Sequence, residues 1–387
     1  MSDPSSQPIG AGNDLPVIKS LENVVRKRQS GTGGEAFYTI GASVGAVFLA
    51  LAIAAVLLLV TGINPWTAYS KMFSLATESS TLYDMLQRAT PLIISAVAVA
   101  IGFKMNLFNI GVEGQYKVGA FLGAIAGANV HLPAPLHVAF IILVSMVGGA
   151  LWAGVAAVLK VGRGVNEVIS TIMLNFIALA VLQFLFDNWF RDDSTSGLNV
   201  KTKLIPTSGW MPQIVHGRLS WFFVIALVVA VLYWIIVFKS RFGFRLRASG
   251  MNAIAARTAG ISSKQMVVMA MLLSGAVAGL VGLPAMLGDL HAYGQDLPKN
   301  KGFDGIAIAL LGRNHPAGIV AAACLFGLLS ATSGGLQIAG VPNSIIDIIQ
   351  AITVLSVVIV NEAVTRKLAN RTAQRAAAAL ELQGAAA

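Results

Sequence analysis

Charged residues are scarce in this 387-residue sequence: Asp, Glu, Lys and Arg make up 11% of it, and 56% is hydrophobic. Soluble domains have about 25% charged residues, so the composition argues against a soluble enzyme or binding domain. Several long runs, such as 132–159 and 265–288, contain no charge at all. Because a helix needs about 20 apolar residues to cross a bilayer, these runs predict an all-α polytopic membrane protein.

Other absences limit the chemistry of the chain. The single cysteine, Cys324, excludes an internal disulfide, and the five histidines are scattered without the spacing of metal ligands. No G-x-x-x-x-G-K-[ST] phosphate loop occurs, and the glycine-rich segment 31–37 lacks the lysine of that loop. We therefore expect no metal, no cofactor and no enzymatic activity in this chain.

Ten segments are candidates for membrane spans. Five come from long apolar runs, and five are shorter or interrupted. The long runs give spans near 40–62, 136–159, 168–189, 219–238 and 266–288, and the shorter ones near 86–103, 116–131, 303–313, 316–335 and 344–361. The sequence thus predicts about ten transmembrane helices.

Basic residues set the expected orientation. The net charge is 27 − 17 = +10, but Lys and Arg cluster in a few loops, which favours membrane topology over nucleic-acid binding as the explanation. Segment 239–265 contains six basic residues and no acid, so it is predicted to be cytoplasmic. Both chain ends are flanked by basic residues and are also predicted to be cytoplasmic, which suits an even number of spans. Loops 187–218 and 289–301 are then external.

Three regions are expected along the chain: a cytoplasmic, disordered tail over 1–38, a transmembrane domain over 39–362, and a cytoplasmic tail over 363–387. Residues 1–20 lack the apolar core of a cleavable signal peptide. Polar, glycine-containing interruptions at 103–117 and 300–315 each follow a short span. Five spans per half would relate the two halves as inverted repeats.

A polar block, "FKMNLFNIGVEGQYKVGAF" (103–121), lies between two apolar runs. Two explanations remain open: a cytoplasmic loop between short helices, or a broken helix that lines a solute pathway, where irregular backbone is tolerated. Under the second, Asn109, Glu113 and Gln115 are candidate solute contacts.

Further polar residues lie within the later apolar runs. Thr171 and Asn175 share a helix face, and Gln183 lies two turns beyond; such residues either bind neighbouring helices or contact solute. Asp304 begins a short span and either caps its helix or faces the pathway.

Four blocks resemble one family. "LFNIGVEGQYKVGAF" (107–121) resembles a motif of the permease subunits of ATP-binding-cassette (ABC) importers, in the branch for nucleosides and simple sugars, which is related to ribose and branched-chain amino acid permeases. Blocks 166–178, 245–263 and 302–319 resemble further motifs of this branch, in the same order. The resemblance covers about 40–362 and implies the ABC importer permease fold.

Segment 239–265 has small residues at helical spacing, so its second part predicts a short amphipathic helix; a basic loop that only sets topology is the alternative. The resemblance implies instead a coupling helix that docks on a separate ATPase subunit, which would bind ATP and Mg²⁺. Its candidate contacts are Met251, Asn252, Ala255, Ala256, Arg257, Thr258, Gly260 and Ile261.

The resemblance also implies a second permease copy or a homologous permease, an extracytoplasmic solute-binding protein, and a bacterial cytoplasmic (inner) membrane whose lipid surrounds the chain. The expected function is translocation of a nucleoside or purine-like solute by alternating access, with simple sugars as the alternative solute. An alternative of another class is a secondary transporter driven by an ion gradient, with Glu113 as its coupling carboxylate.

Overall fold

The computed structural model describes residues 45, 48–192, 200–215, 217–338, 340, 342 and 344–356, with a few isolated positions after 358. The chain forms two compact units, Met1–Ile53 with Leu355–Ala387, and Ala54–Val354; the second unit contains every labelled element. The predicted tail 1–38 lies outside the described residues, and so does almost all of 363–387.

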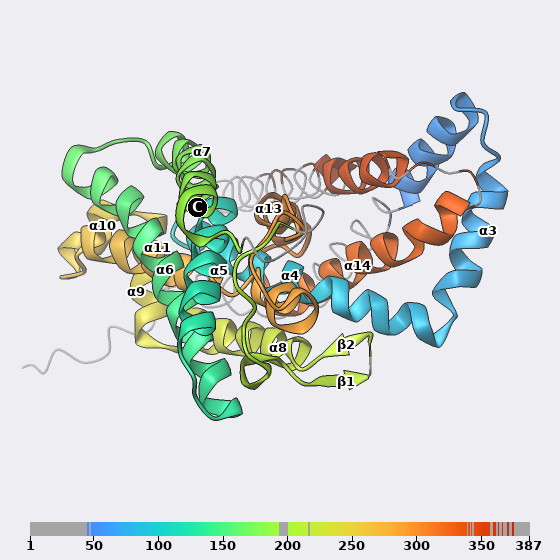
Figure 1. Ribbon diagram of the computed structural model, residues 1–387. Coiled ribbons are helices and arrows are strands. Elements are labelled where there is room, and N and C mark those ends of the chain that lie inside the picture. The colour runs from blue at the N-terminus through green and yellow to red at the C-terminus, as the bar shows by residue number, and fades with distance from the viewer. Residues whose placement is uncertain are drawn as a thin grey trace, which may run out of the picture. The chain divides into compact units, whose positions relative to one another are not determined.

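Helices dominate the described part of the chain, and six are long and apolar enough to cross a membrane. Figure 1 shows their arrangement. The six are α4 (Ser79–Phe103), α6 (Ala134–Arg163), α7 (Glu167–Leu185) continued by η1 (Phe186–Phe190), α8 (Phe222–Trp234) continued by η3 (Ile235–Lys239), α11 (Ser263–Ala278) continued through α12 (Leu283–Ala285) and η4 (Met286–Leu290), and α14 (Pro316–Ile338). They confirm a polytopic helical membrane protein.

The other four predicted spans are helical where described, but each is short or too polar to count by itself. Phe48–Val60 and Ser344–Ser356 are short apolar helices, α13 (Lys301–Leu311) has 11 residues, and α5 (Val112–Asn129) contains the polar block. The total of ten transmembrane helices therefore remains a prediction.

Some elements were not predicted from the sequence. α3 (Pro65–Ala76) precedes α4, with Asn64 accepting a hydrogen bond from Trp66 N as its N-cap and Pro65 at its first position. α4 begins at Ser79 rather than near 86, because polar residues are tolerated at a helix start outside the apolar core. Short strands β1 (Gln213–Val215) and β2 (Leu219–Ser220) form an antiparallel hairpin, which is an exception to the all-α expectation.

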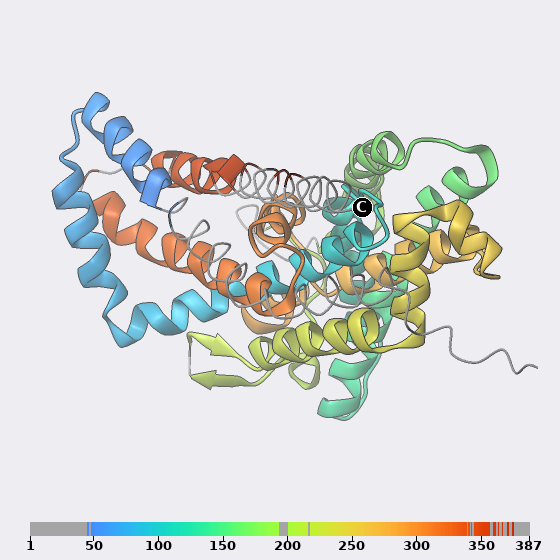
Figure 2. The same cartoon turned by 180° about the vertical axis from the view of Figure 1, so that it is seen from behind.

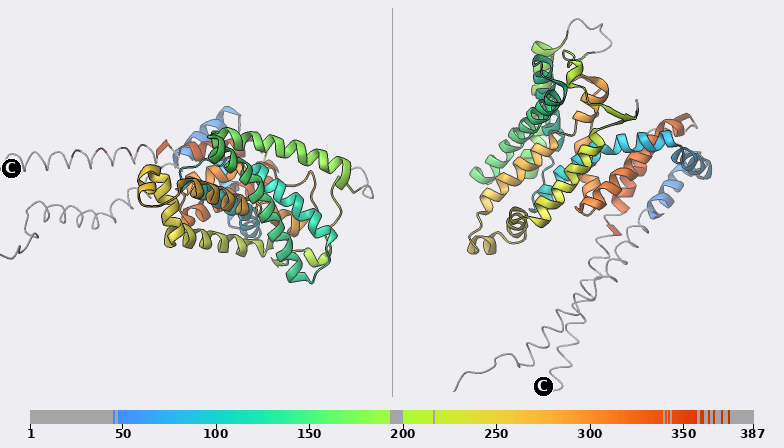
Figure 3. Two further views of the ribbon diagram at one scale, coloured as in Figure 1. Left: turned by 90° about the vertical axis from the view of Figure 1, so that its left-hand side faces the viewer. Right: turned by 90° about the horizontal axis from the view of Figure 1, so that it is seen from below.

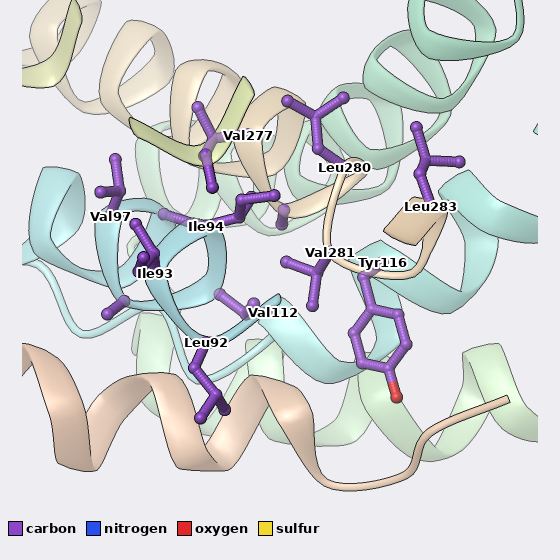
Figure 4. Packing of buried hydrophobic residues seen from close by; sticks show 14 of the residues in the cluster. Leu92, Ile93, Ile94, Val97, Val112, Tyr116, Val277, Leu280, Val281 and Leu283 are labelled. Carbon is purple, nitrogen blue, oxygen red and sulfur yellow. The ribbon is translucent and has the colours of Figure 1, made fainter. Parts of the chain in front are cut away.

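The centre of the bundle is α4. Its residues 96–100 are fully buried, and small Ala side chains alternate there with Val, so neighbouring helices pack closely on every side. Figure 4 shows Leu92, Ile93, Ile94 and Val97 of α4 beside side chains of α5 and of the α11–α12 region. Figures 2 and 3 show α14 alongside α4. A helix surrounded in this way carries apolar residues around its whole circumference.

Glycines let α6 cross α11 at very short distance. A Cβ on Gly149 of α6 would clash with the backbone of Gly275 and Gly279 on α11, and a Cβ on Gly279 would clash with the Ser145 carbonyl. Small residues at such crossings allow van der Waals contact between backbones, which drives helix association in lipid.

The helices connect at two ends of the bundle. One end carries basic residues and is called the basic end. There Lys104, Arg247 and His315 all lie beside the Phe238 ring. At the opposite, hairpin end, residues 200–205 run along 291–294, where Thr202 N donates to the Tyr293 carbonyl. The two loops that were predicted to be external, 187–218 and 289–301, therefore lie against each other.

Two short helices, α5 and α13, meet at their N-termini inside the bundle. α5 ends at the hairpin end, where His137 bridges the Gly127 carbonyl and the Ser208 hydroxyl, whereas α13 ends at the basic end, where Tyr233 donates to the Asn314 carbonyl. They run in opposite directions from similar starts, "NIGVEG" (109–114) and "NKGFDG" (300–305). The relation of the two halves as inverted repeats remains a prediction.

Gly149→Ala should destabilise the protein, because the new methyl group would press on the α11 backbone and overpacking of this kind costs about 1–3 kcal/mol. The melting temperature of the purified protein in detergent should fall by several degrees. Gly162→Ala is the matched control, because a Cβ at this position on the same helix meets open space. Equal melting temperatures for the two variants would contradict the close crossing.

Candidate functional site

The Glu113 carboxylate lies where α5 and α13 meet. It is 3% exposed; its Oε1 accepts a hydrogen bond from Asn300 N (3.0 Å) and its Oε2 accepts one from Gly302 N (2.9 Å). Glu113 also lies in the first turn of α5. A carboxylate at a helix N-terminus is stabilised by the helix dipole and the free N–H groups, and here one carboxylate serves two helices.

Two further side chains complete the environment of this carboxylate. Lys117 Nζ lies 3.1 Å from Glu113 Oε1, and the Tyr116 hydroxyl lies 3.1 Å from the same oxygen and 2.6 Å from the Pro298 carbonyl. Gly302 packs against the backbone of residues 112 and 113 so closely that any Cβ there would clash. Both oxygens of the buried carboxylate are therefore hydrogen-bonded and its charge is paired, the condition under which buried charges are tolerated.

The amides of Asn109 and Gln115 form a second buried cluster. Each donates to the other, at 3.0 and 2.9 Å, and Asn109 Nδ2 also donates to the Ser274 hydroxyl, which donates in turn to the Ala98 carbonyl. The Asn109 Oδ1 accepts from Gly111 N, which closes the turn before α5. These bonds join the turn to α11 and α4.

α7 supports the start of α5 from the other side. Asn175 Oδ1 accepts from Gly114 N (2.8 Å) and Asn175 Nδ2 donates to the Ile110 carbonyl (2.9 Å), so its side chain replaces a backbone partner for both. Thr171, one turn earlier, is buried and would contact any Cβ on Gly111. The predicted shared face of Thr171 and Asn175 is confirmed, and it packs against α5.

The polar block contains both a turn at the basic end and irregular backbone deeper in the bundle. The turn near Lys104 lies at the basic end, and burial, with Arg247 nearby, lowers the pKa of its ammonium group. Residues 109–114 lie deeper in the bundle. Glu167 is the first residue of α7 and accepts a hydrogen bond from the backbone of Phe108. Asn175, which binds Gly114, lies eight residues further, about 12 Å along α7. Irregular backbone at this depth is enclosed by protein.

Two of the predicted pathway residues lie apart from this cluster. Gln183 is exposed on α7 and donates to Asp187 Oδ2 (2.8 Å), and Asp304 pairs with Lys301 (2.9 Å) in the first turn of α13. The other five, Asn109, Glu113, Gln115, Thr171 and Asn175, gather around the start of α5. Their contact with solute stays a prediction, since their hydrogen bonds within the chain account for their burial.

A cavity of about 300 Å³ lies beside the ion pair, between α5, α7 and the loop before α13. Lys117 and Gln183 contribute to its wall, together with Tyr293, Gln295 and Lys299 of the loop. Of these, only Gln183 was predicted as a pathway residue. Lys117 could have been predicted from the sequence, because it lies one helical turn after Glu113. The loop residues could not, because only the folded chain brings 293–299 next to α5.

The predicted coupling segment forms two helices, α9 (Arg241–Met251) and α10 (Ala253–Thr258). Asn252 caps α10 by accepting from Ile254 N and Ala255 N. Most candidate contacts are exposed there, namely Met251, Asn252, Ala255, Arg257, Thr258 and Gly260. Ala256 is the buried residue of α10, and Ile261 packs into the apolar cluster at the basic end.

Two exposed apolar residues of this segment were missed, Phe244 on α9 and Ile254 on α10. Ile254 is 79% exposed and lies near Met251, which is 88% exposed. Two large apolar side chains at the end where basic residues gather, projecting from a short capped helix, are typical of a surface that a partner covers. Docking of an ATPase there remains a proposal.

Glu113→Gln should lower the stability of the solute-free protein strongly, because it leaves the Lys117 ammonium buried without a carboxylate. Breaking a buried pair costs about 3–5 kcal/mol. The melting temperature in detergent should fall, and adding Lys117→Met should restore part of the loss.

Asp84→Asn is the control for this experiment, since it breaks an exposed pair with Arg218 that is worth at most about 1 kcal/mol. A Glu113→Gln protein as stable as Asp84→Asn would show that the carboxylate does not hold the two helix ends together.

Comparison with known proteins gives a consistent result. A family model described as "Branched-chain amino acid transport system / permease component" matches residues 81–358. The guanosine ABC transporter permease protein NupP of Bacillus subtilis (strain 168) is 38% identical over 81% of this chain and 91% of its own length. No solved structure matches the chain significantly.

Two further relatives have similar coverage. The glucose ABC transporter permease protein TsgB13 of Haloferax volcanii is 33% identical over 83% of this chain and 87% of its own length. The nucleoside ABC transporter permease protein NupB of Lactococcus lactis subsp. cremoris is 33% identical over 79% and 87%. Because the family model covers most of the chain and these relatives span nearly their full length, the chain belongs to the family of branched-chain amino acid transport system permease components, and it is a multi-pass ABC transporter permease.

Proposed function

We propose that this chain is the membrane-spanning subunit of an ATP-driven importer for nucleosides or related purine solutes. The observation that carries the proposal is the 38% identity to a guanosine permease over 81% of the chain, with a nucleoside permease at 33%. A glucose permease at the same 33% keeps simple sugars as the second candidate. The matches extend over the segments that contain α5, α7 and α13.

The proposal includes partners. ATP and Mg²⁺ would be bound by a separate ATPase subunit that docks on α9–α10, where Met251, Ile254 and Arg257 are exposed. A second copy of this chain or a homologous permease would complete the pore, and a solute-binding protein would dock at the hairpin end. In this proposal the basic end faces the cytoplasm, because basic residues concentrate on that side of a membrane protein, and both chain termini are cytoplasmic as well.

In this mechanism the chain is a conduit with two states. ATP binding would draw the ATPase subunits together, and α10 would transmit that movement to α9 and α11, against which it packs. The close glycine crossings between α6 and α11 allow rigid helices to shift as units. The solute would then be exposed to one side of the membrane at a time.

An ion-driven secondary transporter is less favoured by the geometry of Glu113. A coupling carboxylate has to gain and lose its ion during transport, whereas this carboxylate already has four partners in a buried junction. Protonation would remove the charge that Lys117 and two helix N-termini stabilise. The same group is well suited to holding α5 and α13 together.

Proteoliposomes that contain this chain with its ATPase, its permease partner and the binding protein should accumulate labelled guanosine only when ATP is supplied. Glucose in large excess should leave this uptake unchanged. ATP-driven glucose uptake without guanosine uptake would show that the chain belongs to a simple-sugar importer instead. Guanosine uptake by the chain alone, driven by a proton gradient, would refute the importer.

Arg257→Glu should abolish ATP-driven uptake while leaving membrane insertion and melting temperature unchanged, because this exposed side chain forms no hydrogen bond or ion pair within the described part of the chain and a reversed charge would repel an acidic ATPase surface. Lys71→Glu makes the same charge change at an exposed position on α3, outside α9–α10, and serves as the control. Co-purification of the ATPase measures docking directly; unchanged co-purification and uptake for Arg257→Glu would remove Arg257 from the interface.

A further inference from the structure

The cavity beside Lys117 has the size and lining of a small-molecule site. Its volume of about 300 Å³ is at the lower end of the roughly 300–1,000 Å³ typical of such sites. Phe186 of η1 and Tyr293 of the loop contribute aromatic rings, and their ring centroids lie 6.3 Å apart. Phe186 is 3% exposed, so the partly exposed Tyr293 ring is the aromatic surface against which a flat solute can lie.

Polar atoms in the cavity wall have hydrogen-bonding capacity to spare. Within the described residues, the Tyr293 hydroxyl and the Gln295 amide form no hydrogen bond, and Gln183 uses only its Nε2, toward Asp187. Burial, with Glu113 nearby, raises the pKa of Tyr293 to about 12, so its phenol stays neutral and able to donate. Two amides and a phenol together offer donors and acceptors for a polar ring edge.

The tyrosine is held in position by the hairpin end. Its backbone N–H donates to Thr202 Oγ1 (3.1 Å) and its carbonyl accepts from Thr202 N (2.8 Å). The ring packs edge-on against Phe121 at 5.1 Å. A ring fixed in this way loses little conformational entropy when a solute binds, which favours affinity.

The charges around the cavity favour an uncharged solute. Helix N-termini are common anion sites, but Glu113 already accepts from two N–H groups at the start of α13, those of Asn300 and Gly302, and Lys117 is paired with the same carboxylate. The remaining cation in the wall, Lys299, is exposed, where water screens its charge. A phosphate group would find no buried, unpaired cation among these residues.

We propose that this cavity is the solute-binding site of the permease and that it holds a neutral nucleoside, with Tyr293 against the base and Gln183 and Gln295 on its polar edge. The proposal rests on the proposed nucleoside import. It adds the position of the site, the residues that form it, and the exclusion of nucleotides.

Photoaffinity labelling tests the position of the site. The complete transporter in detergent is irradiated with 8-azidoguanosine, and the adducts on this chain are mapped by mass spectrometry. Adducts are expected on peptides that contain 179–186 or 293–299, and guanosine should compete whereas guanosine monophosphate and glucose should not. Adducts confined to other parts of the chain, or equal competition by the monophosphate, would overturn the proposal.

Variants test the residues. Tyr293→Phe removes only a hydroxyl and Gln183→Ala only an exposed amide, so both should fold. Because a neutral hydrogen bond contributes about 1 kcal/mol, each should reduce both adduct yield and ATP-driven guanosine uptake about five-fold. Asn188→Ala, on η1 but outside the cavity wall, should change neither.

The outcomes separate this proposal from the import function. If wild-type transporter takes up guanosine with ATP while Tyr293→Phe and Gln183→Ala match Asn188→Ala in labelling and uptake, the site is wrong and the function stands. If wild-type transporter takes up no nucleoside, the function itself fails and the site proposal fails with it.

Discussion

The structure depends on one buried carboxylate that serves two helices at once. Glu113 occupies the first turn of α5 and accepts hydrogen bonds from the backbone at the start of α13, with Lys117 balancing its charge. In lipid, unpaired N–H groups at the ends of half-length helices cost several kcal/mol each. Glu113 removes part of this cost at the start of α13, and Asn109 and Asn175 accept from Gly111 N and Gly114 N at the start of α5. These acceptors allow two helices to begin in the interior of the bundle rather than at its surface.

This junction also links the proposed solute site to the rest of the chain. The loop that leads into α13 carries Tyr293, and the α5 turn that carries Glu113 also carries Lys117, so the cavity wall is made from both sides of the junction. At the other end of α13, the turn before α14 meets Phe238 beside the segment proposed to dock the ATPase. One short helix therefore connects the cavity to the basic end.

Several side chains that look functional in sequence have structural roles first. Asn175 replaces backbone partners for the start of α5, and Asn109 and Gln115 bind one another. Buried amides must be hydrogen-bonded, and a turn enclosed in a membrane protein leaves many backbone groups for them to satisfy. Polar residues inside apolar runs therefore mark irregular backbone as reliably as they mark solute contact.

The sequence by itself determined the membrane class, four of the six long spans as long apolar runs, the importance of 103–121 and the shared face of Thr171 and Asn175, because apolar run length and helical periodicity are local properties. It also contained the family motifs. Only the tertiary structure decided that Glu113 caps α13, nearly 190 residues away, and that Tyr293 and Gln295 line a cavity with Lys117. Those contacts join segments far apart in the chain, and no local pattern encodes which helix ends will meet.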